Sequence, residues 1–228
     1  MSNVRIPQLD ERLQAAADLF AACDTGADIG ADHGRLSCYL LANNRCRSMV
    51  VADISADSLA KARRLLALHQ LEDRADFQVA DGLDALREPA DCVTICGMGG
   101  RVMAEILERG QDKLQAAALV LSCHTEIPLL RSALTKLHYR ICAERLVRAK
   151  GRFYIVLRAE PGEAEYSEKE LYLGPVLMRE QPDLWWRYLY WREDVVKCEQ
   201  GHEKQLQWIR EELKHEPTDR SECGGLAQ

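Results

Sequence analysis

The sequence has no long apolar run, no closely paired cysteines and no histidine cluster, and each absence argues against a class of protein. None of its 228 residues lies in an uncharged apolar stretch of about 18 residues, the length that a membrane-spanning helix requires. The first residues, MSNVRIPQLDERL, lack the apolar core of a signal peptide, so we expect no export. The nine cysteines form no C-x-x-C pair and the six histidines show no metal-ligand spacing. We therefore expect a cytoplasmic protein with reduced thiols and no metal.

Positive charge is also in deficit. The net charge is −6, which argues against non-specific nucleic-acid binding as the main role but leaves room for a local basic patch. Hydrophobic residues make up 47% of the chain, enough for one sizeable core.

Short apolar runs alternate with helical patterns over residues 1–160. A leading helix is expected between Leu9 and Phe20. Strands are expected at 26–29, 48–53, 76–80, 91–96 and 118–123, and helices at 34–43, 56–70, 100–109 and 127–137. This alternation predicts an α/β fold with a parallel sheet covered by helices on both faces. Residues 139–147 and 152–160 predict an antiparallel hairpin at one edge, as in Rossmann-like methyltransferases.

The pattern changes after residue 162 and predicts a separate small helical domain over 163–216. Ser167 and Glu170 have the spacing of a capping box at the start of a helix. A longer helical run at 182–215 is interrupted by a polar segment around Gly201, so we expect an antiparallel, coiled-coil-like pair. Residues 217–228 are expected to form a flexible tail. The predicted domains are therefore 1–160, 163–216 and the tail.

The segment ADIGADHG follows the first long strand and opens the next helix, where a glycine-rich loop binds the cofactor of nucleotide-dependent enzymes. Two carboxylates belong to this segment: Asp28 precedes Gly30, and Asp32 lies between Gly30 and Gly34. They would repel a pyrophosphate but suit a ligand that carries a sulfonium and an ammonium. The loop therefore favours S-adenosyl-L-methionine over a dinucleotide.

Further acids and glycines follow the next three strands. Asp53 lies 23 residues after Gly30, near the offset of about 20 residues at which an acid binds ribose hydroxyls. Asp81 would contact the adenine edge, and the GMGG segment would allow close approach of the methionine half and the reacting base. The predicted cofactor-binding residues are Asp28, Gly30, Asp32, His33, Gly34, Asp53, Ile54, Asp81, Gly82, Gly97, Met98, Gly99 and Gly100.

At these positions the chain resembles the bacterial tRNA methyltransferases that modify N1 of adenine 22. The shared elements are Arg12-Leu13, DIGADHG, Asp53, DGL at 81–83, GMGG, LLRSAL at 129–134, AERLV at 143–147, GRFYIV at 151–156 and YSEKELYLGPVL at 166–177. The resemblance implies tRNA as the partner and adenine N1 as the methylated atom. One departure is SCH at 122–124, where the family usually has Gln-Pro-Asn after the fifth strand.

The residues suit this chemistry better than two other methylations. GMGG has neither the prolines nor the aromatic of enzymes that methylate exocyclic amines. Cys96 and Cys123 lack the Pro-Cys context of carbon-5 methylation and fit buried thiols better. Adenine N1 carries its own lone pair, so an enzyme needs mainly positioning and an acceptor for the exocyclic amine. Asp28 or Asp32 is the expected catalytic acceptor.

Two histidines and seven basic residues are candidates for other roles near the cofactor and the substrate. His33 and His124 fit packing near the cofactor better than general-base catalysis. We expect basic residues to cluster around the carboxyl end of the sheet and the hairpin, where they could attract a phosphate backbone locally. They are Arg35, Arg45, Arg47, Arg145, Arg148, Lys150 and Arg152.

Two rival functions stay open. SCH at 122–124 is compatible with methylation of another RNA or a small molecule. A non-catalytic sensor would instead use the aromatic set of the C-terminal helices to bind a protein partner. That set, which we expect to be exposed, comprises Trp185, Trp186, Tyr188, Tyr190 and Trp191.

Overall fold

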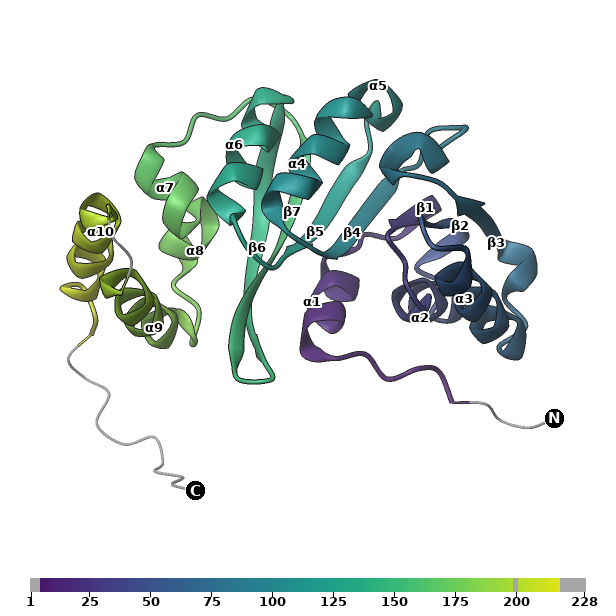
Figure 1. The fold of residues 1–228 in the computed structure, drawn as a ribbon, viewed down its shortest axis with the longest axis horizontal. Coiled ribbons are helices and arrows are strands. Elements are labelled where there is room, and N and C mark those ends of the chain that lie inside the picture. The colour runs from purple at the N-terminus through teal and green to yellow at the C-terminus, as the bar shows by residue number, and fades with distance from the viewer. Residues whose placement is uncertain (1–4, 199–200, 218–228) are drawn as a thin grey trace. The chain divides into compact units, whose positions relative to one another are not determined.

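The protein contains a seven-stranded sheet with the strand order β3-β2-β1-β4-β5-β7-β6 (Figure 1). The computed structural model describes residues 5–198 and 201–217. The strands are β1 (Cys23–Ile29), β2 (Cys46–Asp53), β3 (Ala75–Val79), β4 (Cys92–Met98), β5 (Ala118–Cys123), β6 (Tyr139–Ala149) and β7 (Arg152–Pro161). β1 to β5 pair in parallel, and β7 runs antiparallel to both of its neighbours, β5 and β6. The predicted α/β class and edge hairpin are confirmed.

Helices cover both faces of the sheet. One face carries α1 (Glu11–Leu19), α2 (Arg35–Ala42) and α3 (Ala56–Leu68); the other carries α4 (Gly100–Arg109), α5 (Gln111–Leu114) and α6 (Ile127–Lys136). Successive side chains of a strand point to opposite faces. Accordingly, Val93 and Ile95 pack toward α4 and α6, whereas Cys92 and Cys96 pack toward α1 and α2. Two short 3-10 helices, η1 (Glu72–Arg74) and η2 (Gly82–Ala85), complete the connections.

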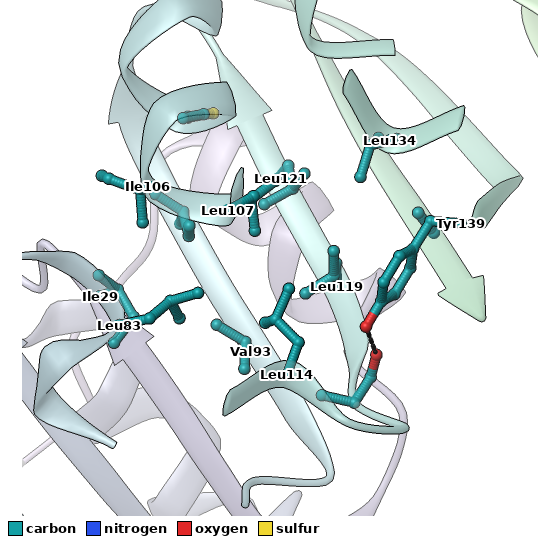
Figure 2. Packing of buried hydrophobic residues seen from close by; sticks show 14 of the residues in the cluster. Ile29, Leu83, Val93, Ile106, Leu107, Leu114, Leu119, Leu121, Leu134 and Tyr139 are labelled. Atoms are coloured by element: carbon teal, nitrogen blue, oxygen red, sulfur yellow. Dashed lines mark hydrogen bonds between the residues drawn. The ribbon is translucent and has the colours of Figure 1, made fainter. Parts of the chain in front are cut away.

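The core on the α4 and α6 face is built from aliphatic side chains of the central strands (Figure 2). Leu119 and Leu121 of β5 and Leu107 of α4 are fully buried there. Tyr139 closes this core at its edge, and its hydroxyl donates to the carbonyl oxygen of Ala117 at 3.0 Å. Every residue of β5 is buried because helices cover both of its faces. This explains why its sequence is apolar at every position except Ser122 rather than alternating.

A buried ion pair attaches two short helices, α7 (Glu168–Leu173) and α8 (Pro175–Glu180), to the sheet. Arg131 of α6 and Glu144 of β6 are both fully inaccessible, with Nη2 and Oε1 2.7 Å apart. Arg131 Nη1 donates to the carbonyl oxygen of Leu171 at 2.8 Å. Glu144 Oε2 accepts the backbone N–H groups of Val176 and Leu177 at 2.9 and 3.2 Å. These contacts satisfy the free carbonyl end of α7 and the free N–H groups that begin α8.

The chain accordingly divides into two compact units between Glu180 and Gln181. The sequence prediction had placed the boundary at 160–163, before α7. The difference arises because two charged side chains that look like surface residues in the sequence form the buried pair. The capping box of α7 is confirmed: Ser167 Oγ accepts the N–H of Glu170 at 3.2 Å, and Glu170 Oε2 accepts the N–H of Ser167 at 2.8 Å.

The described part of the second unit contains α9 (Trp185–Lys197) and α10 (Glu203–Leu213), which pack against each other. Tyr190 donates to Glu216 at 2.7 Å, and Arg210 donates to Glu193 at 2.9 Å. Tyr190 precedes Glu193 in the chain, whereas its partner Glu216 follows Arg210. The order of the contacts is therefore reversed between the two helices, and the pair is antiparallel, as predicted. Of the predicted tail, residues 218–228 lie outside the described part of the chain. No described helix is long and apolar enough to cross a bilayer.

The aromatic set of this unit is less exposed than the sequence suggested. Trp185, Trp186 and Tyr188 are buried, and the rings of Trp185 and Tyr188 are 6.0 Å apart. Tyr190 and Trp191 are the two members of the set with substantial exposure, at 49% and 36%. The reason is helical spacing, because Trp185, Trp186 and Tyr188 fall on the buried face of α9. The count of aromatic residues in the sequence does not show which of them lie on that face.

Candidate active site

A pocket of about 560 Å³ opens at the carboxyl ends of the parallel strands, within the range of small-molecule sites. The chain builds β2 and β3 on one side of β1 and β4 and β5 on the other, so the pocket lies at the switch point where open α/β sheets bind ligands. Its lining residues include Arg12, Asp28, Gly30, Asp32, His33, Arg35, Asp53, Ile54, Asp81, Gly82, Gly97, Met98, Val102, Ile106 and His124. Of the thirteen predicted cofactor residues, Gly34, Gly99 and Gly100 do not line it.

Asp28 lies at the base of the pocket and is only 2% exposed. Its Oδ2 accepts the Ser37 hydroxyl at 2.6 Å and its Oδ1 accepts the Thr94 hydroxyl at 2.9 Å. Burial raises the pKa of this carboxyl, and the two hydroxyl donors oppose that rise. Asp28 thus joins β1 to α2 and β4.

Two glycines of the loop after β1 are required, Gly30 by its left-handed backbone and Gly34 also by its packing against α3. Gly30 has φ +72°, and a Cβ there would lie 2.2 Å from Cε of Met98. A Cβ on Gly34 would lie 2.7 Å from Cβ of Ala62. The loop therefore keeps its shape because Met98 and α3 pack directly against it.

Asp53 connects the loops that follow β1 and β2. Its Oδ2 accepts the N–H of Asp32 at 2.9 Å, and its Oδ1 accepts the N–H of Ser55 at 2.8 Å. The Asp32 carboxylate instead points to the rim, where it lies 2.7 Å from Nδ1 of His33 and both side chains are more than half exposed. Asp53 is therefore held rigidly, whereas Asp32 stays accessible to a bound molecule.

The far end of the pocket has a mixed acidic and apolar rim. Asp81, which follows β3, pairs with Arg109 at 3.0 Å. That contact raises the pKa of the exposed Arg109 guanidinium. Ile54 is 75% exposed and Val102 is 47% exposed, and both line the pocket. With Asp81 they give this end of the pocket both apolar and acidic surface.

The GMGG segment begins inside a strand, because β4 runs on through Gly97 to Met98. Gly97 has φ +90°, and the nearest atom to a Cβ there would be Arg12 Nη1 at 3.9 Å, so this glycine keeps the pocket open. Gly99 and Gly100 face the loop after β5 instead. A Cβ on Gly100 would lie 2.3 Å from the carbonyl oxygen of Glu126. Only the first half of GMGG therefore borders the ligand space.

Three residues on the β5 side of the pocket form a cluster that the sequence did not reveal. Nη1 of Arg12 hydrogen-bonds Nε2 of His124. The ring of Tyr154, on β7, meets the His124 ring edge-on at 5.3 Å and lies 5.3 Å from the Arg12 guanidinium. Burial lowers the pKa of His124, and the positive charge of Arg12 lowers it further. Arg12 and Tyr154 belong to shared motifs, but no sequence pattern indicated that they meet.

The predicted basic residues divide between the two ends of the sheet. Arg35 lines the pocket, and Arg148, Lys150 and Arg152 sit at the hairpin turn, which extends past the carboxyl end of β5. Arg45 and Arg47 flank the start of β2, at the opposite end. Arg45 donates to the Phe20 carbonyl and Arg47 lies 3.9 Å from Asp24. The prediction that these two join the carboxyl-end cluster was wrong, because β2 carries them away from its carboxyl end.

The thiols near the pocket are poor nucleophiles. Burial raises the pKa of Cys96, and it raises the pKa of Cys123 to about 11. The eight cysteines of the described chain are free thiols, and Cys223 lies outside that part. Within the described residues, no group of three or more His, Cys, Asp or Glu side chains is arranged to hold a metal ion.

Comparison with known proteins decides the family. The family model for tRNA (adenine(22)-N(1))-methyltransferase matches residues 26–218, most of the chain. The chain belongs to this tRNA methyltransferase family. A Bacillus subtilis tRNA (adenine(22)-N(1))-methyltransferase is 31% identical over 182 residues, which is 76% of each protein.

Solved structures of the tRNA methyltransferase family show the same fold. Streptococcus pneumoniae Sp1610, in complex with S-adenosyl-L-methionine, superposes with a TM-score of 0.86 at 26% identity, covering 90% of this chain and all of that one. The B. subtilis m1A22 tRNA methyltransferase superposes with a TM-score of 0.78 at 25% identity, covering 91% and 96%. The resemblance inferred from the motifs is confirmed.

Proposed function

We propose that this protein transfers a methyl group from S-adenosyl-L-methionine to N1 of adenine 22 in tRNA. The observation that carries the proposal is the pocket at the switch point of the sheet, with an acid at or just after the carboxyl end of each of β1, β2 and β3 and an open wall at Gly97. Family membership supports the same reaction. Because its substrate is tRNA, we place the enzyme in the cytoplasm.

The residues of the pocket fit S-adenosyl-L-methionine. We expect Asp53, which two backbone hydrogen bonds hold in place, to accept the ribose hydroxyls, and Asp81 to accept from the adenine amine. Ile54 and Val102 supply apolar contacts for the adenine faces. The absence of a side chain at Gly97 leaves room for the methionine half. When bound, the cofactor supplies a methyl group on a positively charged sulfur, which leaves as a neutral thioether.

The chain needs no general base for this transfer. Adenine N1 attacks through its own lone pair, and no proton leaves that atom. The protein therefore contributes position and electrostatics. Asp28 holds the floor of the pocket through Ser37 and Thr94. Of the two acids expected to be catalytic, Asp32 has the accessible carboxylate, and we assign it as the acceptor for the adenine amino group.

The test is methyl transfer to defined tRNA transcripts with labelled cofactor. A transcript with adenine at position 22 should be methylated, and mass spectrometry of its nucleosides should show N1-methyladenosine. The matched transcript with guanine at position 22 should stay unlabelled. Methylation of both transcripts, or of another RNA only, would show that adenine 22 of tRNA is not the specific substrate. Binding of cofactor without any methyl transfer would favour the sensor hypothesis.

A further inference from the structure

The contact between Arg12 and His124 fixes the protonation of the imidazole. A guanidinium can only donate hydrogen bonds, so Nε2 of His124 must accept from Arg12 Nη1. An imidazole whose Nε2 accepts is neutral and carries its proton on Nδ1. The direction of its pKa, lowered by burial and then by Arg12, agrees with this form. His124 thus presents an N–H donor at neutral pH.

The surrounding groups hold this arrangement. Asp10 Oδ2 accepts from Arg12 Nη2 at 3.3 Å, while its Oδ1 caps α1 through the N–H of Leu13 at 2.9 Å. The backbone N–H of His124 donates to the carbonyl oxygen of Met98 at 3.0 Å. The charged and titratable groups that face His124 are Arg12 and Asp10 from the start of α1 and Tyr154 from β7, with Lys150 acting on Asp10.

The cluster lies on the side of the pocket away from the nucleoside acids. His124 follows β5, and Asp53 ends β2; the two strands are separated by β1 and β4. Three strand spacings of about 4.8 Å place these positions about 14 Å apart. If Asp53 holds the cofactor ribose, the open space beside Gly97 and His124 is where a second ring can approach the methyl group.

We propose that His124, fixed by Arg12 as the Nδ1–H tautomer, donates a hydrogen bond to N7 of the acceptor adenine. This rests on the proposed function. Adenine offers three ring nitrogens as acceptors: N1 must face the methyl group, N3 lies beside the attached ribose, and N7 remains. A neutral imidazole also adds no positive charge beside an adenine that becomes cationic on methylation. Arg12 is the positioning residue, and His124 is the residue that contacts the substrate.

The tautomer can be measured without any reaction. Long-range ¹H–¹⁵N spectra of the full chain should show His124 protonated at Nδ1 and unprotonated at Nε2, assigned by the signals lost in His124→Phe. In Arg12→Met the neighbouring cation is gone, so the pKa of His124 should rise toward its ordinary value and the ring should titrate at higher pH. An Nε2–H tautomer in the wild type, or an unchanged titration in Arg12→Met, would overturn the role of Arg12.

The N7 contact is tested by a double-mutant cycle between protein and RNA. His124→Phe keeps a ring beside Tyr154 but removes the donor, and kcat/KM for tRNA should fall about ten- to a hundredfold. Cofactor affinity should stay within about twofold. A tRNA with 7-deazaadenosine at position 22 should show a similar loss with the wild type and little further loss with His124→Phe. Additive losses would disprove the contact.

Two controls separate this inference from the proposed function. His69→Phe, at the far end of α3, should leave all of these values unchanged. If the wild type methylates no tRNA, the proposed function fails and the N7 contact with it, whereas the NMR result still decides the tautomer. If the wild type methylates adenine 22 but 7-deazaadenosine is an equally good substrate, the function stands and the N7 contact is wrong.

Discussion

At the scale of single residues, the carboxylates around the pocket differ in what their oxygens already bind. Both oxygens of Asp28 accept side-chain hydroxyls, and both oxygens of Asp53 accept backbone N–H groups. A carboxylate oxygen has a second lone pair, so Asp53 can still accept from a ligand while its position is fixed. Asp32 has its side chain free of such backbone contacts and exposed. Rigidity at Asp53 suits binding, and access at Asp32 suits contact with the base.

Replacing Asp53 should weaken cofactor binding more than it destabilises the fold. Asp53→Ala removes a charged hydrogen-bond acceptor worth roughly 1.5–3 kcal/mol, so calorimetry should show about ten- to a hundredfold lower affinity for S-adenosyl-L-methionine. Asp76→Ala, an exposed acid near the start of β3, is the matched control and should bind normally. Unchanged affinity in Asp53→Ala would remove this residue from the cofactor site.

The glycines of GMGG should separate into two kinds. Gly97→Ala places a methyl group in the ligand space, so cofactor affinity should fall sharply. The left-handed backbone at this position adds a strain of about 1–2 kcal/mol, which the protein should tolerate and still fold. Gly100→Ala forces Cβ against the Glu126 carbonyl, so thermal unfolding should occur at lower temperature. The folded fraction of Gly100→Ala should bind cofactor as the wild type does. Equal loss of affinity in both variants would contradict the division.

At the scale of elements, the attachment of α7 and α8 to the sheet depends on one fully buried ion pair. Arg131→Met leaves the Glu144 charge buried without its cationic partner, which should lower the free energy of unfolding by about 3–5 kcal/mol in denaturant titrations. Arg179→Met breaks an exposed pair with Glu180 and should cost no more than about 1 kcal/mol. Similar losses in the two variants would show that burial does not set the strength of the Arg131–Glu144 contact.

The sequence predicted the helices and strands better than it predicted the side-chain contacts between them. Strands such as β5 and helices such as α4 were located because apolar periodicity is a local property. The pocket acids were found because they follow strands whose carboxyl ends share one edge. Arg131 with Glu144, and Arg12 with His124, are pairs of distant residues whose charges look solvent-exposed in sequence. Their contacts depend on tertiary packing, which no local pattern encodes.

At the scale of the whole molecule, we propose that the second unit binds the tRNA. Truncation after Glu180 keeps α7 and α8 with the sheet, so the fragment should bind cofactor within a few-fold of the intact chain. Transfer to tRNA should fall steeply, because a polar helical pair that could lie along the RNA is lost. Circular dichroism must first show that the fragment is folded. A folded fragment that methylates tRNA at the full rate would exclude the second unit from RNA binding.

The placement of β7 has a consequence for synthesis on the ribosome. α1, which is made before either strand, packs on β6 and β7, and Arg158 donates to the Leu19 carbonyl across a separation of 139 residues. Until β7 has emerged, β5 has an unpaired edge and Tyr154 has not reached Arg12. The nascent chain can therefore assemble the nucleoside side of its pocket well before the base side. A half-made enzyme could hold cofactor, yet it would have no finished place for an acceptor base.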